Sequence, residues 1–165
     1  MSPEHAFDYD TAVRLIEATD ERWRRTEGED AEVKLNRPSL ERYAHALAFV
    51  SHELPRWIET VSYPGPSGTV ESEVRVLGSD ALYVVTTPWV TDEHGPEPTV
   101  RVRPLSSLRA LEVDGFETDA TGRPIGCTVT LVFSGGSAVR LGASRGADRT
   151  ALAPLLPALL RRVGA

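Results

Sequence analysis

The chain has 165 residues, with 18 Lys and Arg against 24 Asp and Glu, so its formal net charge is −6 at pH 7. This length fits one domain with an ordinary core, and the hydrophobic (41%) and charged (25%) fractions exclude a disordered or fibrous chain. The acidic balance argues against nucleic-acid binding, which usually shows as a basic stripe and a high isoelectric point.

The first sixty residues carry the period of two amphipathic helices. One is predicted over about 11–26, with Asp10 as its N-cap and Gly28 beyond its end. The second begins at Ser39, and Pro55 is expected to end or kink it, with a short turn through Glu59. Its apolar stripe, the strongest in the chain, is Leu40, Tyr43, Ala44, Leu47, Val50, Leu54 and Trp57.

After the Pro- and Gly-rich residues 63–68 the period changes to two, which predicts strands. In residues 70–76, valines and Ser72 alternate with Glu71, Glu73 and Arg75, as in a strand with one solvated face. A short helical turn is predicted at 105–108 and a last helix at about 148–163. The other predicted strands are 81–90, 99–103, 110–116, 128–133 and 138–141.

This order of elements predicts one α+β domain over residues 1–165. Residues 1–62 are expected to form a helical pair. Residues 69–165 are expected to form a mainly antiparallel sheet of about six strands, with a C-terminal helix packed on or plugging the sheet.

The second half resembles the bacterial pleckstrin-homology-like domains. The resemblance rests on the hairpin strands, the segment 102–111, the hairpin at Gly135 and Gly136, and the apolar terminal helix, and it covers about 69–164. It implies a curved antiparallel sheet plugged by the C-terminal helix and a binding or scaffolding role. The loops at 91–94 and 117–119 are acidic, which disfavours phosphoinositide binding.

Catalytic and cofactor patterns are missing from the sequence. His45 and His52 are seven residues apart, about 10.5 Å along a helix, which is too far for one metal ion. The glycine-rich residues 134–137 have no following lysine, so they do not predict a phosphate loop. We expect no cofactor and no metal, and a binding role is favoured over an enzymatic one.

The cellular location of the protein is predicted by elimination. Cys127 is the one cysteine, so no intramolecular disulfide forms. The N-terminal residues lack a basic and apolar leader, and the apolar run 151–160 is interrupted by Pro154 and Pro157. We expect a cytoplasmic protein without membrane insertion.

Two surfaces are candidates for contact with a protein partner or a second copy. The terminal helix is apolar nearly all round, so Leu155 and Leu159 either pack in the core or form an interface. Trp89 follows Pro88 in a predicted strand, and Arg101 and Arg103 lie on the next strand. These three would share a partner patch if the two strands pair; the alternative is that Trp89 covers the core.

The preferred hypothesis is a non-enzymatic protein-binding or adaptor module. One alternative is a small-molecule-binding protein or hydrolase, with a pocket between the helical pair and the sheet lined by Tyr43, His45, His52 and Trp57. Another is an acidic immunity or export-chaperone protein for a basic partner. That second alternative rests on charge, because residues 1–60 carry a net −5 and residues 61–165 a net −1.

Overall fold

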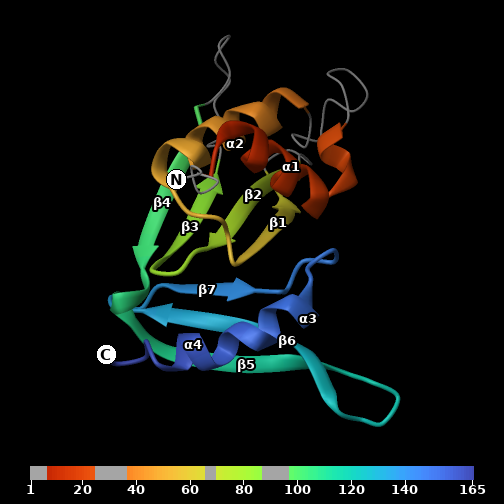
Figure 1. Ribbon diagram of the computed structural model, residues 1–165, viewed down its shortest axis with the longest axis vertical. Coiled ribbons are helices and arrows are strands. Elements are labelled where there is room, and N and C mark those ends of the chain that lie inside the picture. The colour runs from red at the N-terminus through yellow and green to blue at the C-terminus, as the bar shows by residue number, and fades with distance from the viewer. Residues whose placement is uncertain (1–6, 25–36, 66–69, 87–96) are drawn as a thin grey trace, which may run out of the picture.

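A computed structural model describes residues 7–24, 37–65, 70–86 and 97–165. In these residues seven strands form two antiparallel sheets whose strands run across one another (Figure 1). Sheet A has the order β1-β2-β3-β4 and sheet B the order β5-β6-β7. The bounds are β1 Trp57–Pro64, β2 Val70–Leu77, β3 Ala81–Thr86, β4 Thr99–Pro104, β5 Leu108–Thr118, β6 Pro124–Phe133 and β7 Ala138–Leu141.

The N-terminal helices cover one face of sheet A, which confirms the predicted helical pair (Figure 1). They are α1 (Tyr9–Thr19), the short 3-10 helix η1 (Glu21–Arg24) and α2 (Arg37–Val50). Asp8 caps α1 by accepting a hydrogen bond from Thr11 N at 2.8 Å. Their buried side chains, which include Ile16, Trp23, Leu40 and Leu47, pack against Val74, Val76 and Val85 of the sheet.

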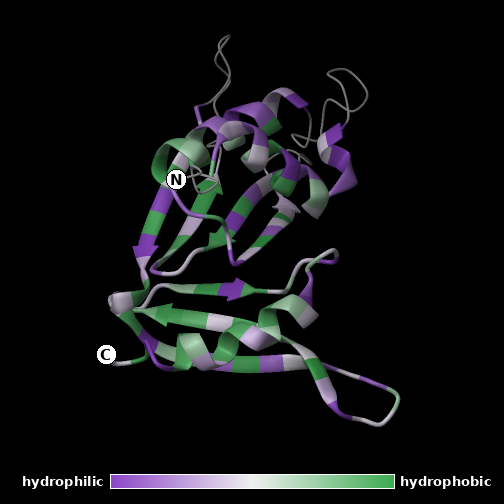
Figure 2. Cartoon of the chain, viewed as in Figure 1, coloured by the Kyte–Doolittle hydropathy of each residue, from purple (hydrophilic) through white to green (hydrophobic). Residues whose placement is uncertain are grey.

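The other face of sheet A meets sheet B and the C-terminal segment. That segment consists of α3 (Arg149–Leu152), η4 (Ala153–Leu155) and α4 (Leu156–Leu160), and it lies across sheet B (Figure 1). Hydrophobic residues line the strands and helices where they meet (Figure 2). We call this the inter-sheet core; it includes Trp57, Leu77, Leu82, Leu108, Val129, Leu131, Phe133, Leu152 and Leu159.

The sequence prediction is wrong at residues 57–62, which were assigned to the helical region. Trp57 and Glu59 belong to strand β1, which pairs with β2 from Trp57 opposite Leu77 to Pro64 opposite Val70. Helix α2 ends at Val50, before Pro55. Trp57 fits both the helical stripe and the two-residue alternation of the strand, and the sheet supplies the hydrogen bonds that decide between them. With this strand, the number of strands in the described residues is seven rather than the predicted six.

The predicted terminal helix is broken. Pro154 and Pro157 lack the N–H that a continuous α-helix needs, so the segment is divided into α3, η4 and α4. The β6–β7 hairpin is confirmed, because Gly135 and Gly136 have φ of +88° and +80°, which glycine adopts without strain. The short turn is also confirmed as η3 (Leu105–Ser107), and residues 87–90 of a predicted strand lie outside the described residues.

The predicted first helix also differs, since α1 ends at Thr19 and residues 21–24 form η1 instead. Asp8, rather than Asp10, is the N-cap. Among the described residues, none of the helices has the length and apolar character needed to span a membrane.

Candidate functional site

Arg101 and Arg103, two residues of the predicted partner patch, lie on β4 and line an open cavity of about 400 Å³ between sheet A and β7. Trp89, the third member, lies outside the described residues. We call this cavity the arginine groove. Its lining residues are Glu73, Arg75, Val84, Arg101, Arg103, Ala138, Val139 and Arg140.

Four guanidinium groups come to the groove from three strands. Strand β2 provides Arg75, β7 provides Arg140, and β4 provides Arg101 and Arg103, which share a face because side chains alternate along a strand. The register places Arg101 opposite Val84 and Arg103 opposite Leu82, two residues that face the inter-sheet core. Glu73 is the one carboxylate among the lining residues, and Arg140 Nη2 lies 2.9 Å from Asp114 Oδ1 of β5. The excess positive charge of the groove therefore comes mainly from Arg101 and Arg103.

A buried carboxylate lies behind the groove. Glu59 of β1 is 1% exposed; its Oε2 accepts hydrogen bonds from Ser144 Oγ (2.9 Å) and Gly142 N (3.3 Å). Its Oε1 lies 3.4 Å from Arg75 Nη1. Burial raises the pKa of Glu59, and the Ser144 hydrogen bond and the Arg75 charge oppose that shift. Glu59 therefore ties sheet A to the residues that follow β7.

Arg75 is the centre of the polar contacts between the two sheets. Its Nε and Nη2 each lie 2.5 Å from Glu73 Oε1, and its Nη1 donates to the backbone oxygen of Arg140. Its side chain is 15% exposed. Its charge is thus committed to Glu73 and Glu59, and its role is to hold β7 against β2.

Within the part of the chain that the structure describes, Arg101 and Arg103 have fewer polar partners than Arg75. Arg103 donates from Nη1 to Ser137 Oγ, and its guanidinium carbon lies 5.6 Å from the centre of the Phe133 ring. Its Nε is buried without a hydrogen-bond partner in the described residues. Arg101 is exposed and has no ion pair with any residue that the structure describes. The groove therefore offers guanidinium donors to an anion.

The residues predicted to line a pocket between helices and sheet are not brought together. Tyr43 is buried on α2 and donates to the backbone oxygen of Ser72 at 3.0 Å. His45 is exposed and stacks on Tyr9, with ring centres 4.1 Å apart. His52 is exposed beyond the end of α2. Apolar side chains fill the space between these helices and sheet A.

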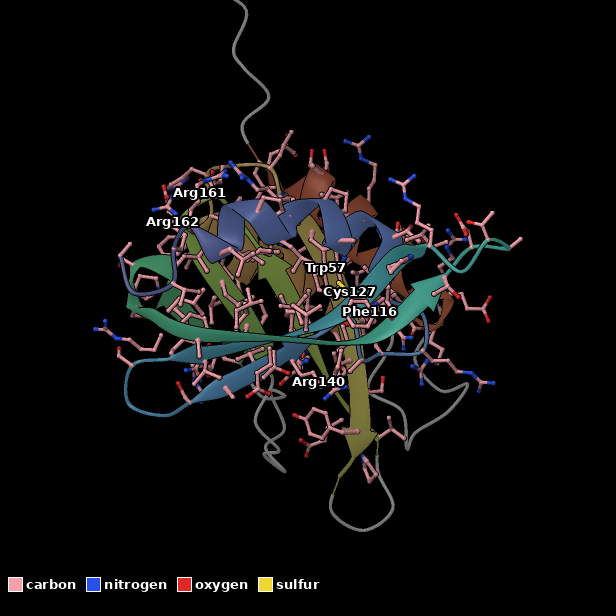
Figure 3. All side chains as sticks on the ribbon, turned by 90° about the horizontal axis from the view of Figure 1, so that it is seen from below. Trp57, Phe116, Cys127, Arg140, Arg161 and Arg162 are labelled. Carbon is pink, nitrogen blue, oxygen red and sulfur yellow. The ribbon has the colours of Figure 1, made fainter. Side chains whose placement is uncertain are left out.

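Trp57, the fourth of those residues, points to the opposite side of sheet A. Its ring belongs to the inter-sheet core, and its Nε1 donates to the backbone oxygen of Asp148 at 2.9 Å. Figure 3 shows it with Cys127 beneath the C-terminal helices. Trp57 thus joins β1 to the start of α3 and is separated from Tyr43 and His45 by the sheet.

Leu155 and Leu159 line a second cavity of about 440 Å³, which we call the terminal pocket. Leu77 and Leu105 share its apolar wall, and the guanidinium-bearing residues Arg56, Arg161 and Arg162 also line it. Arg162 is paired with Asp80 at 2.6 Å. Figure 3 shows Arg161 and Arg162 well apart from Arg140, so the two cavities are separate.

The described residues contain no group of three or more His, Cys, Asp or Glu side chains able to hold a metal ion. Burial, and to a lesser extent the charge of Asp114, raise the pKa of the Cys127 thiol. A raised pKa reduces the fraction of nucleophilic thiolate, so Cys127 acts as a small core residue.

Sequence reasoning missed Glu59, Arg75 and Arg140 as parts of a site. The sequence pattern assigns Arg75 and Glu73 to a solvated face, but β7 contacts that face through the hydrogen bond from Arg75 to Arg140, and the two side chains are only 15% and 14% exposed. The sequence places arginines at alternate positions of its predicted strands. Only the pairing of those strands shows that the arginines line one groove. Glu59 had no such signal, because its strand was assigned to a helix.

No protein-family model matches the chain, and a search of the curated proteins found no match. The chain is similar to one solved structure, described as a DUF1696 family protein with a pleckstrin-homology domain from Shewanella loihica PV-4. The two share 12% identity with a TM-score of 0.40, over 72% of this chain and 87% of that chain. The domain named there is the kind that the sequence pattern resembles.

Proposed function

We propose that this protein is a non-catalytic protein-binding module that takes an acidic segment of its partner in the arginine groove. The observation that carries the proposal is the convergence on one open cavity of four guanidinium groups, two of which, Arg101 and Arg103, have no ion pair with any residue that the structure describes. Guanidinium groups bind carboxylates with paired donors, which makes an acidic side chain the matching ligand.

The arginines of the groove differ in their contacts, and this difference supports a binding role. Arg75 is fixed by carboxylates of the protein itself, whereas Arg101 and Arg103 project from the edge strand without an ion pair to any residue that the structure describes. The protein as a whole is acidic, so the groove is a local reversal of its charge. This reversal favours an acidic partner over the basic partner suggested by the net charge alone.

The test is a titration of fluorescein-labelled hexaglutamate, with hexaglutamine as the neutral control. We expect the acidic peptide to bind, with an affinity that falls as salt is added, because rim charges are screened. The double variant Arg101→Ala/Arg103→Ala should bind at least about tenfold more weakly. The matched control is Arg109→Ala, which removes an exposed arginine of β5 outside the groove.

Two results would reject the proposal. One is hexaglutamate binding that is equal in the double variant and the wild type. The other is an Arg109→Ala effect as large as that of the double variant, since it would show attraction to arginine anywhere on the surface.

A small-molecule role is the second candidate, and the terminal pocket favours it. Its volume of about 440 Å³ lies in the range of small-molecule sites, roughly 300–1,000 Å³, and its leucine wall lies beside arginines. These features fit a carboxylate on an apolar chain. Octanoate should shift the NMR signals of Leu155 and Leu159, and the shift should disappear in Arg56→Ala/Arg161→Ala; unchanged Leu155 and Leu159 signals would reject this role.

A further inference from the structure

Strand β4 is an edge strand. Within the described residues it pairs with β3 on one side and with no strand on the other (Figure 1). An edge strand directs the N–H and C=O groups of alternate residues away from its sheet, where they can pair with another chain. The groove residues Arg101 and Arg103 lie on this strand.

The two faces of β4 differ in chemistry. Arg101 and Arg103 point to the groove, while Val100 and Val102 point to the opposite face. Val102 is 48% exposed, so its apolar surface is only partly covered. The alternation of hydrophilic and hydrophobic residues along β4 is visible in Figure 2.

We infer that the partner segment binds as an extended strand added to the edge of β4, with acidic and apolar side chains in alternation. This inference rests on the proposed function and specifies the partner's conformation and sequence pattern. The acidic side chains would face Arg101 and Arg103, and the apolar ones would continue the surface of Val102.

The spacing of the arginines supports this pattern. Residues at positions i and i+2 of a strand share a face, and each residue advances the strand by about 3.3 Å. A partner strand has the same repeat, so carboxylates two residues apart match Arg101 and Arg103 one to one. A helical or clustered acidic segment does not share this repeat, although its charge is attracted to the same groove.

The test compares two peptides of identical composition and charge. One alternates as acetyl-Glu-Val-Glu-Val-Glu-Val-amide, and the other is blocked as acetyl-Glu-Glu-Glu-Val-Val-Val-amide. Added backbone hydrogen bonds and matched side chains favour the alternating peptide, and we expect it to bind at least about tenfold more tightly. Equal affinities would overturn the inference while leaving the proposed function intact.

A second measurement examines the backbone directly. N-methylation of all glutamates or of all valines removes alternate N–H donors, and an added strand directs only one of these sets toward β4. We expect one methylated peptide to lose binding at least about tenfold while the other retains it. Equal losses from both methylations, or no loss from either, would contradict strand addition.

The protein side is tested with matched serine variants. Val102→Ser should weaken the alternating peptide about fivefold, whereas Ile125→Ser, at an exposed apolar residue of β6, should leave its affinity unchanged. Hydrogen exchange of the β4 amides should slow when the alternating peptide is bound. Unchanged exchange in β4 would overturn the inference, and the failure of every acidic peptide to bind would reject the proposed function itself.

Discussion

The two faces of sheet A are built differently, although the same strands supply both. On the helix-covered face, Val74 and Val76 pack against the apolar side chains of α1 and α2. On the other face, Glu73 and Arg75 alternate with those valines and meet Glu59 and β7. One face is closed by packing, and the other is held in part by charges and leaves a groove open. The difference indicates that the helices stabilise the sheet, and it places the proposed binding groove on the opposite side.

The largest loss of stability is expected from a substitution that removes packing from the helix-covered face. Leu47 is fully buried there, so Leu47→Ala should lower the free energy of unfolding by about 4 kcal/mol through lost burial and a residual cavity. Hexaglutamate affinity, measured where the variant is still folded, should equal that of the wild type. Urea unfolding and a peptide titration check the two expectations. If the variant loses affinity for hexaglutamate as well as stability, the two faces of sheet A are not independent.

The next largest loss of stability is expected from a substitution that removes the charge joining the two sheets. Arg75→Met leaves Glu59 and Glu73 without their common partner, and losing one member of a buried ion pair costs roughly 3 kcal/mol. The double variant Arg75→Met/Glu59→Gln should recover part of this loss, because it removes one unpaired carboxylate. Urea unfolding of the wild type, the two single variants and the double variant provides the comparison. A double variant whose change equals the sum of the two single changes would mean that Glu59 and Arg75 are not coupled.

A smaller effect concerns the connection between β1 and the C-terminal segment. Asp148 caps α3 by accepting from Ala151 N at 2.9 Å, so Asp148→Ala should cost about 1 kcal/mol of stability. Asp148→Asn keeps an acceptor and should cost less. Both variants retain the backbone oxygen that accepts from Trp57. Thermal unfolding measures the difference, and equal losses in the two variants would argue against the cap.

The smallest effect is a change in pH dependence. Burial raises the pKa of Glu59 above its ordinary 4.5, so the folded protein holds this proton more tightly than the unfolded chain does. The resulting stability is complete below about pH 4.5 and is lost as the pH rises through the folded-state value. Glu59→Gln cannot ionise, so it should gain stability relative to wild type as the pH rises above about 4.5. A difference that stays constant with pH would contradict this.

Periodicity was enough to predict the helical pair, most strands and the β6–β7 hairpin. These elements have strong local signals, such as the apolar stripe of α2 and the two glycines at positive φ. Strand β1 was missed because Trp57 also fits the helical stripe, and only pairing with β2 distinguishes the two. Local periodicity therefore failed where a long-range partner decides the structure.

The candidate site was predicted in part. Arg101 and Arg103 were identified as neighbours on one strand face, and they line the groove. Arg75 and Arg140 come from strands in different sheets, so their approach depends on how the two sheets pack. Sequence reasoning assigned Arg75 to solvent because alternation predicts two faces of a strand but not what covers each face.

The hydrogen bond from Arg75 to the backbone oxygen of Arg140, with the bonds of Glu59 to Gly142 and Ser144, fixes the spacing between sheet A and β7 before any partner arrives. The groove is therefore preorganised. The loss of conformational entropy on binding falls mainly on the incoming segment, so the rigidity of that segment should determine the affinity.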